Sequence, residues 1–509
     1  MKSSMPLSDT WRAPLYEALL RHRSARPHSF HVPGHALGQA LKETPAAPDY
    51  AAMLQLDVTE LSDTDDLHQP EGVILEAQHL AAATFGAEET CFLVGGSTAG
   101  NLALILAHCR PGDILLVQRN VHKSVIHGLQ LAQATAVFLS PSYEEASGLA
   151  LIPSLSDLAT ALQQYPQAKA VLLSNPNYYG FGVGLEPYVE LIHSYGLPLL
   201  VDEAHGAHYG LHPELPGSAL AAGADGVVQS THKTLTAMTM GAMLHMQGNR
   251  IDRPAVRQML QLVQSSSPSY PIMASLDIAR AMIDSAGPIL FEPALACVSS
   301  FRKRLANETQ FEAANLPIVQ GQEGLEACYI DPLRAAVQDR TGTLSGYAIQ
   351  SKLEAYGCWA EMANEAYVVL IFGPGTRDKD VETLLGAFKK ISETLEPGRD
   401  RPNKSGLGTP LEVTNDREVH SDRISDPIPF GIHLVREQAT EIISLQEAEG
   451  RISGEMITPY PPGIPLVYVG ERFTQATITR LQRLAALGAK CQGASDSTLT
   501  TVRVWVKTV

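Results

Sequence analysis

The segments GLPLLVDEAHGAHYG (Gly196–Gly210) and ADGVVQSTHKTLTAMTMGAMLHM (Ala224–Met246) decide the fold of this chain. Each contains an apolar run that predicts a buried strand. The first run ends at Asp202, and the second, Gly226–Gln229, is followed closely by Lys233. Ligands of open α/β sheets bind beyond the carboxyl ends of the strands. The pattern therefore predicts a carboxylate and a lysine that face one binding site.

A lysine and an aspartate at two strand ends suit a cofactor that carries an aldehyde. A partly desolvated lysine beside a cationic group has a lowered pKa and can form a Schiff base with such an aldehyde. Pyridoxal 5'-phosphate (PLP) supplies the aldehyde, and its pyridinium nitrogen needs a nearby carboxylate. We therefore expect Lys233 to bind PLP and Asp202 to pair with the ring nitrogen. The alternative is a surface lysine and a turn aspartate, and the neighbouring Ser230, His232 and His205 make it the weaker one.

The two motifs resemble those of the Orn/Lys/Arg decarboxylases, a family of PLP enzymes with the aspartate-aminotransferase (type I) fold. Further motifs of that family occur in a fixed order over most of the chain: FHVPGH (30–35), DVTEL and DDLHQPEG (57–72), GGSTAGN (95–101), RNVHKS (119–124), SSSPSY and MASLD (265–277), and PYPPGIP (459–465). Two positions depart from the pattern. Ala36 and Met240 stand where members of the family often carry lysine and glutamine.

Composition limits the classes of partner. The 509 residues include 38 Lys and Arg against 54 Asp and Glu, a net charge of −16, which disfavours nucleic acid and anionic membranes. The six cysteines are scattered, so neither a metal site nor a disulfide framework is expected, and a reducing cytoplasm fits best. No apolar run approaches the roughly 18 residues of a membrane span. We expect a soluble cytoplasmic enzyme with no metal.

Strand-like and helix-like segments alternate from Ile74 to Asp202, which predicts an α/β fold with a mostly parallel central sheet and helices on both faces. The expected domains are listed in chain order: an N-terminal arm (1–60), a large PLP-binding domain (61–290), a small α/β domain (291–395), a flexible linker (396–430) and a C-terminal decarboxylase domain (431–509).

The cofactor phosphate has a predicted binding segment of its own. Gly96, Ser97 and Thr98 follow an apolar run and open a helical pattern, so backbone N–H groups, the helix dipole and two hydroxyls can face one anion. As a lone motif it would be an ordinary N-cap. The resemblance implies that Ser230 and His232 add donors, although His232 could equally be a packed core histidine.

Two further histidines are candidates for the site. The resemblance implies that His122 stacks on the pyridine ring. His205, three residues after Asp202, could orient that carboxylate or contact the carboxylate of the substrate. A supporting structural role is the alternative for His205.

A cationic substrate side chain needs a carboxylate at the far end of its pocket. Candidates are Glu60, Asp63, Asp65, Asp66 and Glu455, and Glu455 stands out because the rigid segment PYPPGIP follows it. The resemblance also implies a homodimer or higher homo-oligomer in which Ser267 reaches the site of the partner subunit.

The expected reaction is decarboxylation of a basic amino acid, most simply L-arginine to agmatine and CO₂ in polyamine synthesis, because the chain resembles the shorter arginine decarboxylases that lack an N-terminal wing domain. Decarboxylation of lysine or ornithine, another PLP reaction such as transamination, and a non-catalytic regulator are the alternatives. Arg377 is only a weak candidate for the arginine that an aminotransferase needs. An intact Lys233, Asp202 and Ser97 argue against a regulator.

Overall fold

The structure is a computed structural model that describes residues 11–145, 147–315, 328–395, 423–436, 438–460 and 463–506. The chain divides into two compact units, Met1–His108 with Leu185–Pro293, and Cys109–Gly184 with Ala294–Val509. Each unit is described by itself. The domain boundaries expected from the sequence stay predictions, and most of the predicted linker, residues 396–422, lies outside the described residues.

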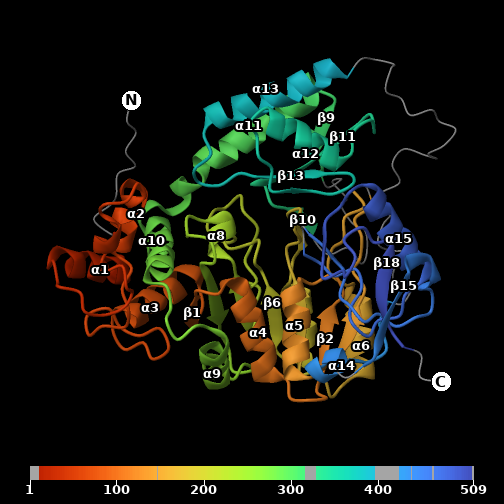
Figure 1. The fold of residues 1–509 in the computed structure, drawn as a ribbon, viewed down its shortest axis with the longest axis horizontal. Coiled ribbons are helices and arrows are strands. Elements are labelled where there is room, and N and C mark those ends of the chain that lie inside the picture. Colours follow the sequence, from red (N-terminus) through yellow and green to blue (C-terminus); the bar gives the residue numbers. More distant parts are fainter. Residues whose placement is uncertain are drawn as a thin grey trace. The chain divides into compact units, whose positions relative to one another are not determined.

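Four neighbouring strands form the sheet of the first unit (Figure 1). Their order is β1 (Glu89–Leu93), β8 (Ala242–Met246), β7 (Gly226–Gln229) and β6 (Leu199–Asp202). β6 and β7 are parallel, whereas β8 runs antiparallel to both β7 and β1. All four residues of β6 and of β7 are buried, which explains their uninterrupted apolar pattern. The strand predicted at 226–229 is confirmed at both ends.

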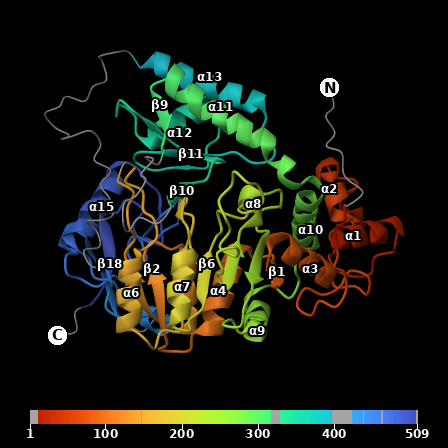
Figure 2. The same ribbon diagram turned by 180° about the vertical axis from the view of Figure 1, so that it is seen from behind.

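The helices of the first unit are α1 (Pro14–Ser24), α2 (Ala47–Leu54), α3 (Val73–Phe85), α4 (Gly96–His108), α7 (Glu186–Ser194), α8 (Thr231–Thr234), α9 (Arg253–Val263) and α10 (Tyr270–Ala286), with short 3₁₀ turns at Gln39–Leu41 and Gly287–Leu290. α4 packs against α9, and also against strands β1, β7 and β8. α1, α3 and α10 pack against one another in a second group (Figure 2).

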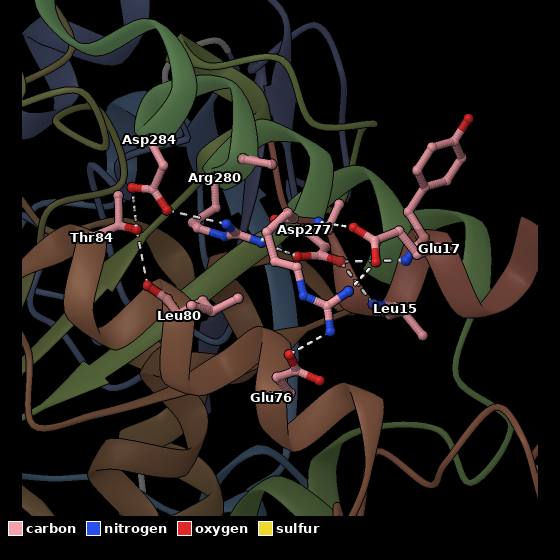
Figure 3. Close-up of polar contacts among 12 residues, drawn as sticks. Leu15, Glu17, Glu76, Leu80, Thr84, Asp277, Arg280 and Asp284 are labelled. Carbon is pink, nitrogen blue, oxygen red and sulfur yellow. Dashed lines mark hydrogen bonds and ion pairs between the residues drawn. The ribbon is translucent and has the colours of Figure 1, made fainter. Parts of the chain in front are cut away.

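A buried ion pair on α10 holds the N-terminal helix (Figure 3). The Asp277 carboxylate accepts hydrogen bonds from the backbone N–H groups of Leu15 (2.9 Å) and Tyr16 (3.3 Å) in the first turn of α1. The guanidinium of Arg280 donates to Asp277 and to Asp284. Asp277 and Arg280 are at most 1% exposed. The residue before α1 provides no side-chain cap, so Asp277 caps this helix from a distant part of the chain.

The sheet of the second unit contains, in order, β4 (Ala170–Ser174), β2 (Ile114–Gln118), β3 (Thr135–Leu139) and β14 (Ile428–Pro429). β2 is parallel to both β3 and β4, as the alternating pattern predicted. β14 is antiparallel to β3. Parallel pairs thus occur in both units, and the reversed strands β8 and β14 make the sheet of each unit mixed. Helices α5 (Lys123–Ala132) and α6 (Leu155–Gln164) complete this segment, and β5 (Phe181–Val183) pairs with β10 (Cys328–Ile330).

A small α/β region belongs to the second unit. Its antiparallel strands, in order, are β12 (Met362–Ala363), β13 (Val368–Ile371), β11 (Arg334–Asp339) and β9 (Phe311–Ala313). Its helices are α11 (Glu292–Glu308), α12 (Gly346–Ala355) and α13 (Asp378–Thr394), and Figure 1 shows α11 and α13 side by side over the sheet. Phe388 of α13 packs against Phe301 and Phe311.

The C-terminal segment forms its own core. β15 (Thr440–Ser444) pairs with β18 (Thr501–Trp505), β16 (Thr458–Pro459) pairs with β17 (Cys491–Gln492), and the helices are α14 (Ile432–Arg436), α15 (Gln475–Ala486) and a 3₁₀ turn at Leu445–Glu447. Arg119, which follows β2, donates to Glu471 and lies 3.8 Å over the ring of Tyr468. This buried arginine ties the segment to the β2 end within the same unit.

Among the described residues, no single helix is long and apolar enough to cross a membrane. The bent pair formed by Tyr270–Leu290 and Glu292–Glu308 passes the same test by length and composition.

Candidate active site

The first unit brings together most of the residues that the sequence assigned to the cofactor. α4 begins at Gly96, so Ser97 and Thr98 lie in its first turn, where backbone N–H groups have no partner within the helix. Gly96 has φ = +72°, a conformation that favours glycine, and its N–H donates to the carbonyl oxygen of Met240 (3.0 Å). The N-terminus of α4, with the partial positive charge of the helix dipole, therefore suits the predicted anion site.

One turn further along α4, Asn101 orients the carboxylate of Asp202. The side-chain N–H of Asn101 donates to Asp202 (2.9 Å), and the backbone N–H of Ala204 donates to the other carboxylate oxygen (3.1 Å). Asp202 is 5% exposed, and its desolvation raises the pKa, opposed by the charge of Lys233. A buried carboxylate with a raised pKa is stabilised by a cation, and a protonated ring nitrogen is a cation of the right kind.

Lys233 lies on α8, and its ammonium nitrogen is 3.1 Å from Nε2 of His205. Since an ammonium can only donate, His205 accepts at Nε2 in this contact. His205 is 5% exposed. The sequence suggests that His205 orients Asp202 or contacts the substrate. In the structure, its imidazole contacts Lys233. A neutral imidazole at this distance can receive a proton from Lys233, which is required before the amine acts as a nucleophile.

Ser230, which precedes α8, supports the fit of a phosphorylated cofactor. Its side chain is fully buried, and Oγ has no hydrogen-bond partner among the described residues. A buried hydroxyl without a partner carries a desolvation cost that a ligand oxygen removes. His232 makes a hydrogen bond through Nδ1 to the carbonyl oxygen of Gly241 (3.1 Å). The lysine, the buried carboxylate, the helix N-terminus and the orphaned hydroxyl all suit PLP.

A chain of buried polar side chains runs from Glu203, the residue after β6, across β7 and β8 to β1. Glu203 accepts hydrogen bonds from the side chain of Gln229 (2.7 Å) and the backbone N–H of Ala219 (2.7 Å). Nε2 of His245 contacts the side-chain amide oxygen of Gln229 (3.1 Å), and its Nδ1 contacts the hydroxyl of Thr90 (2.8 Å). Desolvation raises the pKa of Glu203 to about 8 and lowers that of His245 to about 3, so both are neutral near pH 7. Successive strand residues face opposite ways, so Glu203 points away from Asp202.

The state of Glu203 predicts a pH dependence of stability. Its pKa is raised above the ordinary value of about 4.3, so the folded protein holds a proton that the unfolded chain has lost. This contribution is complete below about pH 4 and is lost as the pH rises towards about 8. We expect the melting temperature of the parent to fall over this window more steeply than that of Glu203→Gln. Thermal unfolding from pH 5 to 9 measures the difference.

A suitable control for the Glu203 prediction is Glu43→Gln, because Glu43 is exposed. That variant should follow the parent at every pH. If the melting temperatures of the parent and of Glu203→Gln changed in parallel with pH, the raised pKa of Glu203 would be contradicted.

Three other assigned residues have the following surroundings within their own units. His122, in the second unit, caps α5 and contacts the hydroxyl of Ser124 (2.8 Å). Glu455, also in the second unit, is 6% exposed and accepts hydrogen bonds from the backbone N–H groups of Ser495 (2.7 Å) and Arg503 (2.8 Å). Ser267 is exposed and precedes α10 in the first unit. The roles assigned to all three stay predictions.

Comparisons with known proteins agree with this fold and geometry. Residues 13–380 match the family model of the Orn/Lys/Arg decarboxylase major domain, and residues 430–496 match that of the C-terminal domain of the same family. The chain therefore belongs to the Orn/Lys/Arg decarboxylases. It is a PLP-dependent amino-acid decarboxylase with the type I fold.

Individual relatives cover nearly the whole chain. The Bacillus subtilis protein YaaO is 40% identical over 94% of this chain and 96% of its own length. An arginine decarboxylase of Bacillus subtilis is 32% identical over 96% of this chain and 97% of its own length. Among solved structures, lysine decarboxylase A of Pseudomonas aeruginosa superposes with a TM-score of 0.76 at 22% identity, over 97% of this chain and 81% of that one.

Proposed function

We propose that the protein decarboxylates L-arginine to agmatine and CO₂, as a cytoplasmic enzyme of polyamine synthesis. The main support is the 32% identity with an arginine decarboxylase over almost the full length of both chains. The net charge of −16 favours a cationic substrate over an anionic one. All six cysteines are free thiols, as in a reducing compartment.

The residues of the first unit would divide the work around the cofactor. When bound, PLP supplies the electron sink that accepts the electron pair of the Cα–carboxylate bond. Lys233 would hold the cofactor, and His205 would accept the proton from its Nζ atom, which is 3.1 Å away. Asp202, oriented by Asn101, would keep the ring nitrogen protonated. The N-terminus of α4 and the hydroxyl of Ser230 would bind the phosphate.

Purified protein incubated with PLP and each of L-arginine, L-lysine and L-ornithine tests the proposal. We expect agmatine as the main product, with the highest kcat/KM for arginine. Cadaverine as the main product would show that lysine is the substrate, and putrescine would show that ornithine is. A keto acid would point to transamination, and no product from any of the three would overturn basic amino-acid decarboxylation.

The proposed contact between Glu455 and the substrate can be tested against the contacts that the structure shows. Glu455→Gln would place an amide N–H group opposite one of two backbone N–H donors, so we expect a loss of about 1–3 kcal/mol of stability. Thermal unfolding measures this loss. A rise in KM for arginine with an unchanged melting temperature would instead support the substrate role. The matched control is Glu441→Gln, which changes a half-exposed glutamate of the same segment.

The active form proposed here is a homodimer in which Ser267 reaches the site of the partner. Large apolar side chains of the N-terminal arm are solvent-exposed in the single chain, including Phe30 (98%) and Val32 (63%), which suits burial against a second copy. Mixing Lys233→Ala chains with Ser267→Trp chains, each inactive alone, should restore activity if the site is shared. Light scattering that shows a fully active monomer would contradict the dimer.

A further inference from the structure

The loop that follows Lys233, residues 235–241, touches both the lysine segment and the phosphate cradle. The carbonyl oxygen of Gly241 accepts the backbone N–H of His232 (3.1 Å), beside the lysine. The carbonyl oxygen of Met240 accepts the N–H of Gly96 (3.0 Å), at the start of α4. This loop therefore fixes the position of the lysine segment relative to the N-terminus of α4.

At its start the loop is held by the buried side chain of Leu235 and by the hydroxyl of Thr236, which contacts the sulfur of Met282 on α10 (3.4 Å). Met238 and Met240 are 40% and 49% exposed, so burial contributes little. Met240 also has φ = +76°, which is an unfavourable backbone conformation for a methionine. Such a conformation persists only where surrounding contacts impose it. Hydrogen bonds of the loop backbone are contacts of this kind.

Ser275 supplies such a contact. Its hydroxyl, 8% exposed on α10, accepts the backbone N–H of Met238 (2.9 Å) and donates to the carbonyl oxygen of Ile272 (2.7 Å). The carbonyl oxygen of Met238 in turn accepts the N–H of Gly241 (2.9 Å), which closes the turn around Met240. Ser275 thus fixes one end of the turn whose middle carbonyl holds Gly96.

α10 is a rigid base for this contact. Two residues after Ser275, Asp277 caps α1, and the buried Arg280 joins Asp277 to Asp284 (Figure 3). The hydroxyl of Thr84 on α3 also donates to Asp284 (2.8 Å). The helix that carries Ser275 is therefore anchored to two other helices of the unit.

We propose that Ser275 is a positioning residue for cofactor binding: it holds the Met238–Gly241 turn so that the Met240 carbonyl keeps the N-terminus of α4 in place relative to Lys233. This inference rests on the proposed function, since it concerns the same PLP site. Ser275 itself acts only through the turn.

The test is Ser275→Ala, read out by PLP affinity and by hydrogen exchange. Loss of one hydrogen bond should weaken PLP binding to the apoprotein about two- to tenfold, measured by titration of the visible absorption band. In the apoprotein, the amides of Met238 and Gly241 should exchange faster than in the parent. Ser275→Thr keeps the hydroxyl and should restore both values.

Ser285→Ala is the matched control. Ser285 lies on the same helix, and its hydroxyl donates to the carbonyl oxygen of Ala281, as that of Ser275 does to Ile272. This variant should leave PLP affinity and loop exchange unchanged. Equal losses in both alanine variants would mean that only the helix is destabilised, and would overturn the proposal.

Met240→Gly tests whether relief of the backbone strain in the turn compensates for loss of the Ser275 hydroxyl. Glycine adopts φ = +76° without strain, so Ser275→Ala combined with Met240→Gly should recover part of the lost affinity. Unchanged affinity and exchange in Ser275→Ala would overturn the inference. If the parent binds no PLP, the proposed function fails, and the exchange of Met238 alone decides whether Ser275 positions the turn.

Discussion

Lys233→Ala should abolish turnover and the visible absorption band of the PLP-loaded protein. Lys233 is the lysine that the structure places beside both Asp202 and the imidazole of His205. A methyl group can neither hold the cofactor nor release the product amine, so we expect turnover to fall on the order of 10⁴-fold or more, as when the nucleophile of other covalent enzymes is removed. Absorption spectra and the rate of CO₂ release from the substrate measure the two effects.

The control for Lys233 is Lys303→Ala, since Lys303 is an exposed lysine of α11. That variant should match the parent in spectrum and rate. Borohydride reduction followed by peptide mapping should label Lys233 in the parent. A Lys233→Ala protein that kept a borohydride-reducible band and turnover would place the cofactor on another lysine.

Asp202→Asn should leave PLP bound and lower kcat on the order of 10²–10³-fold. Asp202 is a buried carboxylate, fixed by Asn101 and by the N–H of Ala204, and it cannot be replaced by solvent. An amide of the same shape carries no charge, so it cannot stabilise a protonated ring nitrogen. The absorption spectrum reports whether PLP is retained, and kcat reports the loss.

Asn101→Ala separates orientation from charge at the same carboxylate. It removes one hydrogen bond to Asp202 but keeps the charge, so its loss of kcat should be smaller than that of Asp202→Asn. A near-normal rate for Asp202→Asn would make Asp202 a structural residue.

The sequence predicted the elements whose pattern is local. The apolar runs that end at Asp202 and Gln229 form buried strands. Strands that are covered on both faces have uninterrupted hydrophobic sequences, so such runs can be recognised from the sequence. Likewise, Gly96 was recognisable because a helix that follows a strand and begins with glycine and hydroxyl residues commonly binds an anion. The antiparallel direction of β8 had no local signal, since strand direction is set by distant pairing.

Roles that depend on contacts between distant residues were not visible in the sequence. The role of Asn101 requires that α4 pass beside the end of β6, although its position four residues after Ser97 places both on one helix face. His205, three residues after Asp202, contacts Lys233, a partner that the sequence did not indicate. Glu455 contacts backbone groups 40 and 48 residues away, which no local pattern indicates.

The cap that Asp277 provides for α1 also has a consequence for the order of events during synthesis. The hydrogen bond to Leu15 spans 262 residues of sequence, so the ribosome must add α10 before α1 can be capped. At about 5–20 residues per second, the N-terminal helix waits roughly 13–52 s for its partner. The stability of an isolated eleven-residue helix is marginal in water. The residues of α1 therefore remain accessible to chaperones during that time. α1 therefore reaches its final packing only after the chain has been made up to α10.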